Sequence, residues 1–166
     1  MIDLHTHSLF SDGELIPSEL VRRMEALGYK AVAITDHVDA SQLDFVVPRI
    51  VHIAEELNHH QAVRVIPGVE LTHVPPGLIA SLVKEARELG AALVVIHGES
   101  PVEPVAPGTN RAGIEAKADI LAQVWNPLLY IVNSFLKTRQ KTFFFKLWSG
   151  ADLRESLGDF SLKGVL

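Results

Sequence analysis

Apolar runs of strand length alternate with amphipathic segments over the first 122 residues of the chain. Each run stops at a polar or acidic residue, and a segment with helical periodicity follows it. This alternation is typical of βα units. Strands are predicted at residues 1–4, 31–34, 63–69 and 91–96, and a fifth strand starts at 120–122.

Four helices are expected between these strands, because proline, glycine or a capping residue marks their ends. Proline suits the first turn of a helix, and glycine suits the position after the last turn. These signals place helices at residues 17–27, 43–57 and 75–89, and a fourth from Asn110 as its cap. Within the second helix, Pro48 predicts a kink or a late start.

Some of the predicted strands are apolar on both faces, as in "AVAI" and "AALVVI". Such runs suit strands that are covered on both sides in a parallel sheet or barrel. The length of 166 residues is that of one domain, and 48% apolar with 21% charged residues is the balance of a folded globular protein. The predicted fold class is therefore α/β.

Composition narrows the classes of function. There is no cysteine, so a metal ion has to be held by histidine, aspartate or glutamate. A net charge of -5 gives no basic surface for nucleic acid. The start "MIDLH" lacks the pattern of a secretory signal, and polar residues interrupt the most apolar stretch, 121–136. We expect a cytoplasmic protein with no membrane span and no nucleic-acid partner.

Ligand-type residues fall at the ends of four predicted strands. They are His5 and His7, then Asp36 and His37, then Glu70, and finally His97. In parallel α/β folds the carboxyl ends of the strands lie on one face, where active sites are built. We therefore expect these side chains to converge, although they are far apart in the sequence.

Histidine nitrogens and carboxylate oxygens are the usual protein ligands of Zn²⁺, Mn²⁺ and Fe²⁺. The spacing of His5 and His7 turns both side chains to one face of a strand. Glu70 has two carboxylate oxygens and can bridge two ions. Metals held in this way lower the pKa of a bound water to about 7 and neutralise charge on phosphoryl oxygens. Hydrolysis of a phosphate ester fits this set of ligands.

Several other polar residues have two interpretations. Asp12 is either a ligand beside His5 and His7 or a stabiliser of the turn "SDG". Asp36 could orient a neighbouring ligand. Arg111 either holds a phosphate near the start of a helix or forms a surface ion pair. The remaining histidines are His73, which is placed near the site without a partner, and His52, His59 and His60, which are expected in solvent.

The stretches "DLHTHSLFSDGE", "AVAITDHVD", "VIPGVELTH" and "VVIHGE" resemble the PHP family, the polymerase and histidinol phosphatase domains, over residues 2–122. The likeness is greatest to stand-alone members described as histidinol-phosphatase-like. It implies a distorted seven-stranded βα barrel that hydrolyses phosphate esters with up to three divalent ions, Zn, Mn or Fe. It also implies a small phosphorylated substrate.

Matched to the motifs of the family, six residues are implied as metal ligands. The resemblance assigns His5 and His7 to the first metal, Glu70 to the first and second, His97 to the second, and Asp12 and His37 to the third. The family also uses a histidine in His-Pro-Gly at the end of the fifth strand and a later Asp-x-His pair. These three have no counterpart here, so we expect weak metal binding and low activity, with an unclosed barrel edge open to oligomerisation.

The character of the chain changes after residue 122. Residues 1–122 carry nine basic and seventeen acidic side chains, whereas 123–166 carry six and three. All eight histidines precede residue 98, and eight of the eleven aromatic residues follow residue 122. We therefore divide the chain into a barrel portion, 1–122, and an atypical tail, 123–166. Either a frameshift or misassembled gene replaced the rest of the barrel, which we favour, or a helix starting near Leu121 covers the open barrel.

Two other functions remain open. An amidohydrolase also begins with His-x-His at the first strand, but it needs a bridging carboxylate or modified lysine, and Lys30, Lys84 and Lys117 are not predicted at strand ends. A degenerate PHP domain without activity would explain the three missing ligands.

Overall fold

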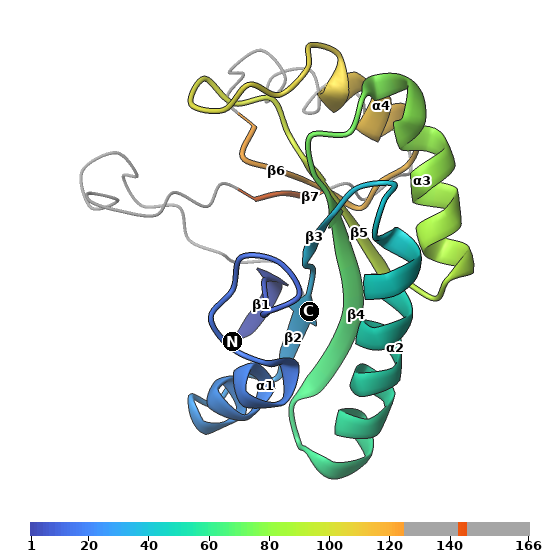
Figure 1. Ribbon diagram of the computed structural model, residues 1–166. Helices are drawn as coiled ribbons and strands as arrows, with labels where there is room; N and C mark the ends of the chain where they lie inside the picture. Colours follow the sequence, from blue (N-terminus) through green and yellow to red (C-terminus); the bar gives the residue numbers. More distant parts are fainter. Residues whose placement is uncertain (125–142, 146–166) are drawn as a thin grey trace, which may run out of the picture.

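The computed structural model describes residues 1–124 and 143–145, and it contains each of the βα units predicted for the first 122 residues (Figure 1). The strands are β1 (Ile2–Thr6), β2 (Ala31–Ile34), β3 (His37–Val38), β4 (Arg64–Leu71), β5 (Leu93–His97), β6 (Ile120–Ala122) and β7 (Phe143–Phe145). The helices are α1 (Pro17–Ala26), α2 (Leu43–His60), α3 (Pro76–Glu88) and α4 (Thr109–Glu115). The α/β class is confirmed.

The described strands form one parallel sheet in the order β1-β2-β4-β5-β6-β7, which curves as a half-barrel. The short strand β3 was not predicted, since two residues are too few to show a pattern. It pairs with the far end of β4, placing His37 opposite Glu70, whereas β2 pairs with the first half of β4. The chain thus leaves the sheet only at Thr35 and Asp36 and returns beside the site.

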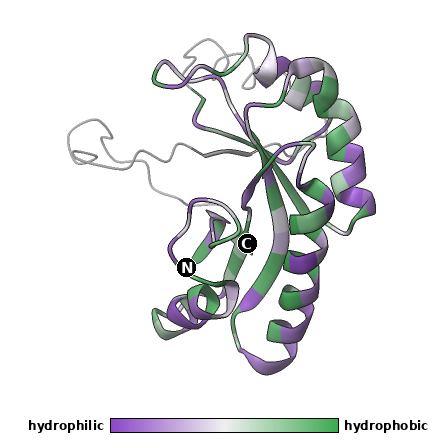
Figure 2. Ribbon diagram, viewed as in Figure 1, coloured by the Kyte–Doolittle hydropathy of each residue, from purple (hydrophilic) through white to green (hydrophobic). Residues whose placement is uncertain are grey.

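The hydrophobic core lies between the sheet and its helices. Strand side chains at alternate positions, such as Ile34 on β2 and Val69 on β4, are fully buried there against Leu43 of α2 and Ile79 of α3. Burying a side chain of this kind contributes about 1.5–3 kcal/mol. The strands are largely hydrophobic, while the helices carry both hydrophobic and hydrophilic residues (Figure 2). One helical layer therefore fixes one face of the sheet.

Two predicted helix starts can be compared with the structure. Helix α2 begins at Leu43, as predicted, and runs through Pro48, so the alternative of a late start is wrong. Helix α4 begins at Thr109 after Gly108, and Asn110 lies inside it instead of capping it. The reason is a long-range contact: a Glu99 carboxylate oxygen accepts the backbone N–H groups of Gly108 and Asn110, both at 3.0 Å.

Most of the tail, including most of the helix predicted near Leu121, lies outside the described residues. Leu121 itself belongs to β6. Phe143–Phe145 form β7 in parallel register with β6. Among the described helices, none is long and apolar enough to cross a membrane.

Candidate metal centre

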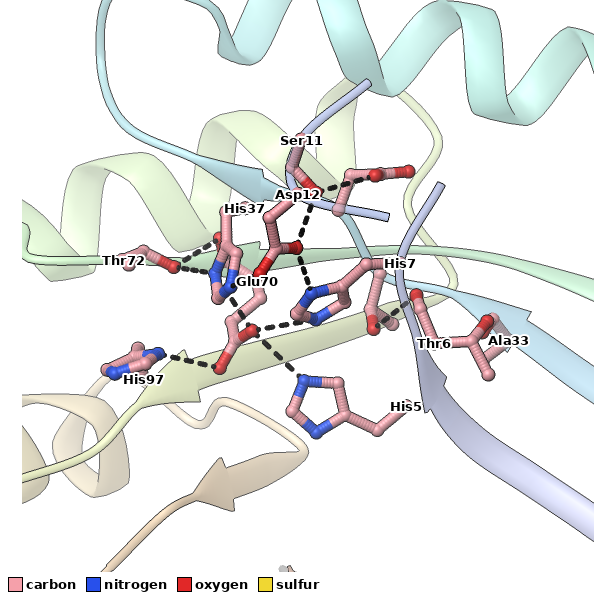
Figure 3. Close-up of polar contacts among 12 residues, drawn as sticks. His5, Thr6, His7, Ser11, Asp12, Ala33, His37, Glu70, Thr72 and His97 are labelled. Carbon is pink, nitrogen blue, oxygen red and sulfur yellow. Dashed lines mark hydrogen bonds and ion pairs between the residues drawn. The ribbon is translucent and has the colours of Figure 1, made fainter. Parts of the chain in front are cut away.

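Five ligand candidates converge at the carboxyl ends of the strands, as the alternation of strands and helices predicted, and they are His5, His7, His37, Glu70 and His97. The sixth, Asp12, joins them from a loop. Figure 3 shows the carboxylate of Glu70 between the side chains of His5, His7, His37 and His97. Glu70 is fully buried on β4, and its pairing with β3 and β5 brings a histidine to it from either side.

Four imidazoles contact the one carboxylate of Glu70. Its Oε2 lies 3.0 Å from His5 Nε2, 3.1 Å from His7 Nε2 and 3.0 Å from His37 Nδ1. Its Oε1 lies 3.3 Å from His97 Nδ1. A carboxylate oxygen has about two lone-pair directions, so three nitrogens around Oε2 exceed what hydrogen bonding requires. The arrangement is that of ligand atoms gathered around cations.

Asp12 reaches this cluster from the loop that follows β1. Its Oδ1 lies 2.7 Å from His7 Nδ1, and its Oδ2 lies 3.6 Å from His37 Nε2. The loop can close because position 13 is glycine: a Cβ there would lie 2.3 Å from the carbonyl oxygen of His7. Asp12 therefore does more than stabilise its own turn.

Asp36 anchors the same loop from beneath. This fully buried carboxylate accepts the backbone N–H of Ser8 at 2.8 Å, the Ser8 hydroxyl at 2.8 Å and the Ser11 hydroxyl at 2.7 Å. Sequence reasoning gave Asp36 an orienting role but not its partners. It acts on the loop that carries His7 and Asp12, because Ser8 and Ser11 lie in that loop.

The pKa values of the cluster reflect these contacts. Burial by itself would raise the pKa of Glu70, but the four histidine side chains close to its carboxylate outweigh burial and hold that pKa well below its usual range. Burial lowers the pKa of His7 and of His97, yet Glu70 and a second carboxylate beside each raise both pKa values above 6.5. Burial would also raise the pKa of Asp12, but its hydrogen bond with His7 outweighs burial and lowers that pKa. Glu70 is thus a stable anion.

Three overlapping sets of ligand atoms in this cluster fit a divalent ion. They are His5, His7 and Glu70; His37, Glu70 and His97; and His7, Asp12 and His37, with the atoms of each set within 4.8 Å of one another. Several of these atoms are buried without a hydrogen-bond partner: His5 Nδ1, His7 Nε2, Glu70 Oε1 and His97 Nδ1. Buried polar atoms are costly unless something satisfies them. The residues present therefore fit metal ions, with Glu70 shared by two sets.

The position of His37 adds to the implied ligand scheme. The resemblance placed His37 with Asp12 alone, but its Nδ1 also faces Glu70, and the same Nδ1 lies 2.5 Å from the Thr72 hydroxyl. Thr72 was missed because a threonine just after a strand has no distinctive sequence signal. His37 can therefore belong to either of two sets.

Other candidate residues lie apart from the cluster. Arg111 is 83% exposed and pairs with Glu115 at 2.8 Å, one helical turn away, so phosphate binding by Arg111 stays a prediction. The expectation for the three remaining helical histidines is confirmed, since His52, His59 and His60 are exposed on α2. The lysines considered for an amidohydrolase, Lys30, Lys84 and Lys117, lie before β2, within α3 and after α4.

His73 has a partner that the sequence did not indicate. Its Nε2 lies 3.4 Å from Glu103 Oε2, and the same Glu103 oxygen lies 2.8 Å from His97 Nε2. Glu103 was missed because it lies in the loop after β5, away from any strand end.

Comparison with known proteins shows what this chain is similar to. The family model of the PHP domain matches residues 3–146, which extend beyond the residues 2–122 that carry the resembling motifs. The uncharacterized protein MJ1295 of Methanocaldococcus jannaschii is 51% identical over 122 residues, which cover 72% of this chain and 56% of that protein. The chain thus spans little more than half the length of this curated relative.

Proposed function

The chain belongs to the PHP domain family, and from that premise we propose that it is part of a metal-dependent phosphoesterase that hydrolyses a phosphomonoester such as histidinol phosphate. One observation carries the proposal. The buried carboxylate of Glu70 lies among four imidazoles at the carboxyl ends of parallel strands, where enzymes of this architecture build their active sites.

Different residues of the cluster would hold different ions. His5 and His7 would hold one ion with Glu70, His97 would hold another with Glu70, and Asp12 with His37 would hold a third. When bound, divalent Zn, Mn or Fe ions act as Lewis acids that neutralise phosphoryl charge and make water a better nucleophile at neutral pH. The protein contributes anionic and neutral ligands fixed in a largely buried site, which lowers the cost of reorganisation.

The finer features of the fold and of its partners also belong to this proposal. We propose that the half-barrel is the first part of a distorted seven-stranded barrel, completed in a longer protein or by association at an open sheet edge. The small phosphorylated substrate, the lack of a nucleic-acid partner and the cytoplasmic location stay predictions. So does the division at residue 122.

The test compares metal binding and turnover in matched variants. Zn²⁺ or Mn²⁺ is titrated calorimetrically into the chain and into Glu70→Gln, with Glu56→Gln on the exposed face of α2 as the control. Phosphate release from histidinol phosphate is then measured with each metal. We expect Glu70→Gln to abolish metal binding and phosphate release together, while Glu56→Gln changes neither.

The outcomes separate the competing functions. Failure to take up metal in near-stoichiometric amount, together with no phosphate release, would favour the degenerate domain, whereas near-stoichiometric uptake would argue against it. Phosphate release that persists in Glu70→Gln would contradict the proposal, because the reaction would not depend on the carboxylate at the centre of the cluster.

A further inference from the structure

A second group of ligand atoms lies beyond the Glu70 cluster, on the outer side of His97. Glu103 Oε2 lies 2.8 Å from His97 Nε2 and 3.4 Å from His73 Nε2. The ligand atoms of these three residues all lie within 4.8 Å of one another. Two imidazole nitrogens thus face one carboxylate oxygen, as His5 and His7 face Glu70.

The backbone is arranged to bring this group together. His73 has a φ of 52°, in the left-handed region that a residue other than glycine seldom adopts. This conformation brings its ring to 5.4 Å from the ring of His97. Strain of about 1–3 kcal/mol at such a position persists only where the surrounding structure imposes it, and it concentrates at functional sites.

The loop that carries Glu103 is held at both sides. Glu99 accepts the backbone N–H groups of Gly108 and Asn110, and the Asn110 side chain accepts the backbone N–H of Glu99 at 2.9 Å. Gly98 permits the tight exit from β5, since a Cβ there would lie 2.6 Å from the carbonyl oxygen of Ala122. Glu103 is therefore presented by an anchored loop.

We propose that His73, His97 and Glu103 form an additional divalent-metal site, which we call the outer site. Two histidines and one glutamate are a ligand set that binds Zn²⁺ and leaves a position for an oxygen ligand from solvent or substrate. The side chain of His97 is 3% exposed, whereas those of His73 and Glu103 are 44% and 37% exposed. The outer site thus has one buried ligand and two ligands that solvent can reach.

The outer site shares His97 with the Glu70 cluster, and this sharing has a consequence. His97 Nδ1 faces Glu70 and its Nε2 faces Glu103. A neutral imidazole has a lone pair on only one of its nitrogens. An ion in the outer site uses Nε2 and leaves the proton on Nδ1, so it withdraws His97 from the inner set of His37, Glu70 and His97. The inner set then holds its ion by His37 and Glu70, so an ion in the outer site weakens inner binding without reducing the number of ions bound.

A simpler role for Glu103 predicts different results. Carboxylates commonly accept the second ring N–H of a metal-binding histidine, and Glu103 would then only orient His97 toward Glu70. In that case His73 has no part in binding metal. The variants His73→Asn and Glu103→Gln separate these roles, because orientation of His97 needs Glu103 alone.

The experiment is a calorimetric titration of the whole chain with Zn²⁺, repeated with Co²⁺ to record its d–d absorption. Asparagine at position 73 tolerates the left-handed backbone, so the variant should fold. The control is His59→Ala, which removes an exposed histidine of α2. Urea unfolding of the chelated proteins checks that all variants are equally stable.

We expect His73→Asn and Glu103→Gln each to lose one equivalent of Zn²⁺ and the matching Co²⁺ absorption, while His59→Ala binds as the parent does. The double variant His5→Ala/His7→Ala should keep the outer site. Unchanged stoichiometry in His73→Asn would overturn the proposal, whether or not Glu103→Gln weakens binding. Because no substrate is present, the result is independent of whether the chain is a phosphatase.

Discussion

The most informative perturbation is at Asp36, which contacts no candidate ligand directly but anchors the loop that carries two of them. Its two carboxylate oxygens accept three hydrogen bonds of 2.7–2.8 Å from Ser8 and Ser11, and both Asp36 and Ser8 are fully buried. In Asp36→Ala all three donors lose their acceptor. The hydroxyl of Ser11 is only partly buried and can turn to water, but the Ser8 backbone N–H cannot.

The structure sets the size of the effect. A buried donor left without a partner costs about 1–3 kcal/mol, and the lost hydrogen bonds to a charged acceptor add to that cost. We expect Asp36→Ala to lower the free energy of unfolding by about 3–5 kcal/mol. Asp36→Asn keeps one acceptor oxygen for Ser8 N–H and Ser11, and its amide can donate to the Ser8 hydroxyl, so it should cost only about 1 kcal/mol.

Metal affinity shows whether Asp36 positions the loop of His7 and Asp12 or only stabilises the fold. Asp36→Asn should remain folded yet bind Zn²⁺ or Mn²⁺ about 10–100-fold more weakly, because His7 and Asp12 are held less firmly. Urea unfolding of the chelated protein and calorimetric titration measure the two effects. Ser11→Ala is the graded control, since it removes one of the three bonds. If Asp36→Asn bound metal as tightly as the parent, the loop would be held by other contacts and the reasoning would be refuted.

Three further predictions address the loop, the charges and the core. Gly13→Ala places a Cβ against the carbonyl oxygen of His7, so it should cost about 1–3 kcal/mol in urea unfolding and weaken metal binding; unchanged values would show that the loop shifts freely. In metal-free protein, the raised pKa values of His7 and His97 contribute stability below pH 6.5 that is lost as the pH rises through the folded-state pKa values, while the lowered pKa of Glu70 contributes above pH 4.5. With chelator present, the free energy of unfolding should therefore be highest between pH 4.5 and pH 6.5 and fall toward pH 8. Metal affinity should instead rise with pH, because the histidines lose protons. A chelated protein that became more stable toward pH 8 would contradict this account. Ile79 is fully buried on α3, so Ile79→Ala should lower the free energy of unfolding by about 2–5 kcal/mol without changing the number of metal ions bound. Loss of one bound ion would show that helix packing also shapes the site.

Local sequence patterns determined most of the framework. Alternating apolar runs and amphipathic segments located the strands and helices, because burial on one or both faces imposes a period on the sequence. The strand ends then located His5, His7, Glu70 and His97 on one face, since parallel strands share a carboxyl edge. The order of strands and helices was enough to predict that these residues are neighbours, although it predicts no particular side-chain contact.

Contacts between distant segments could be decided only by the tertiary structure. Strand β3 exists because β4 offers it a partner, and the start of α4 is satisfied by Glu99 instead of by Asn110. The loop anchored by Asp36 and the pairing of His73 with Glu103 likewise join residues that no periodicity relates. A sequence pattern records which face of an element is buried, but a hydrogen bond or ion pair depends on the position of both partners in space. The sequence therefore determined which strand-end residues gather, and the fold decided what each of them contacts.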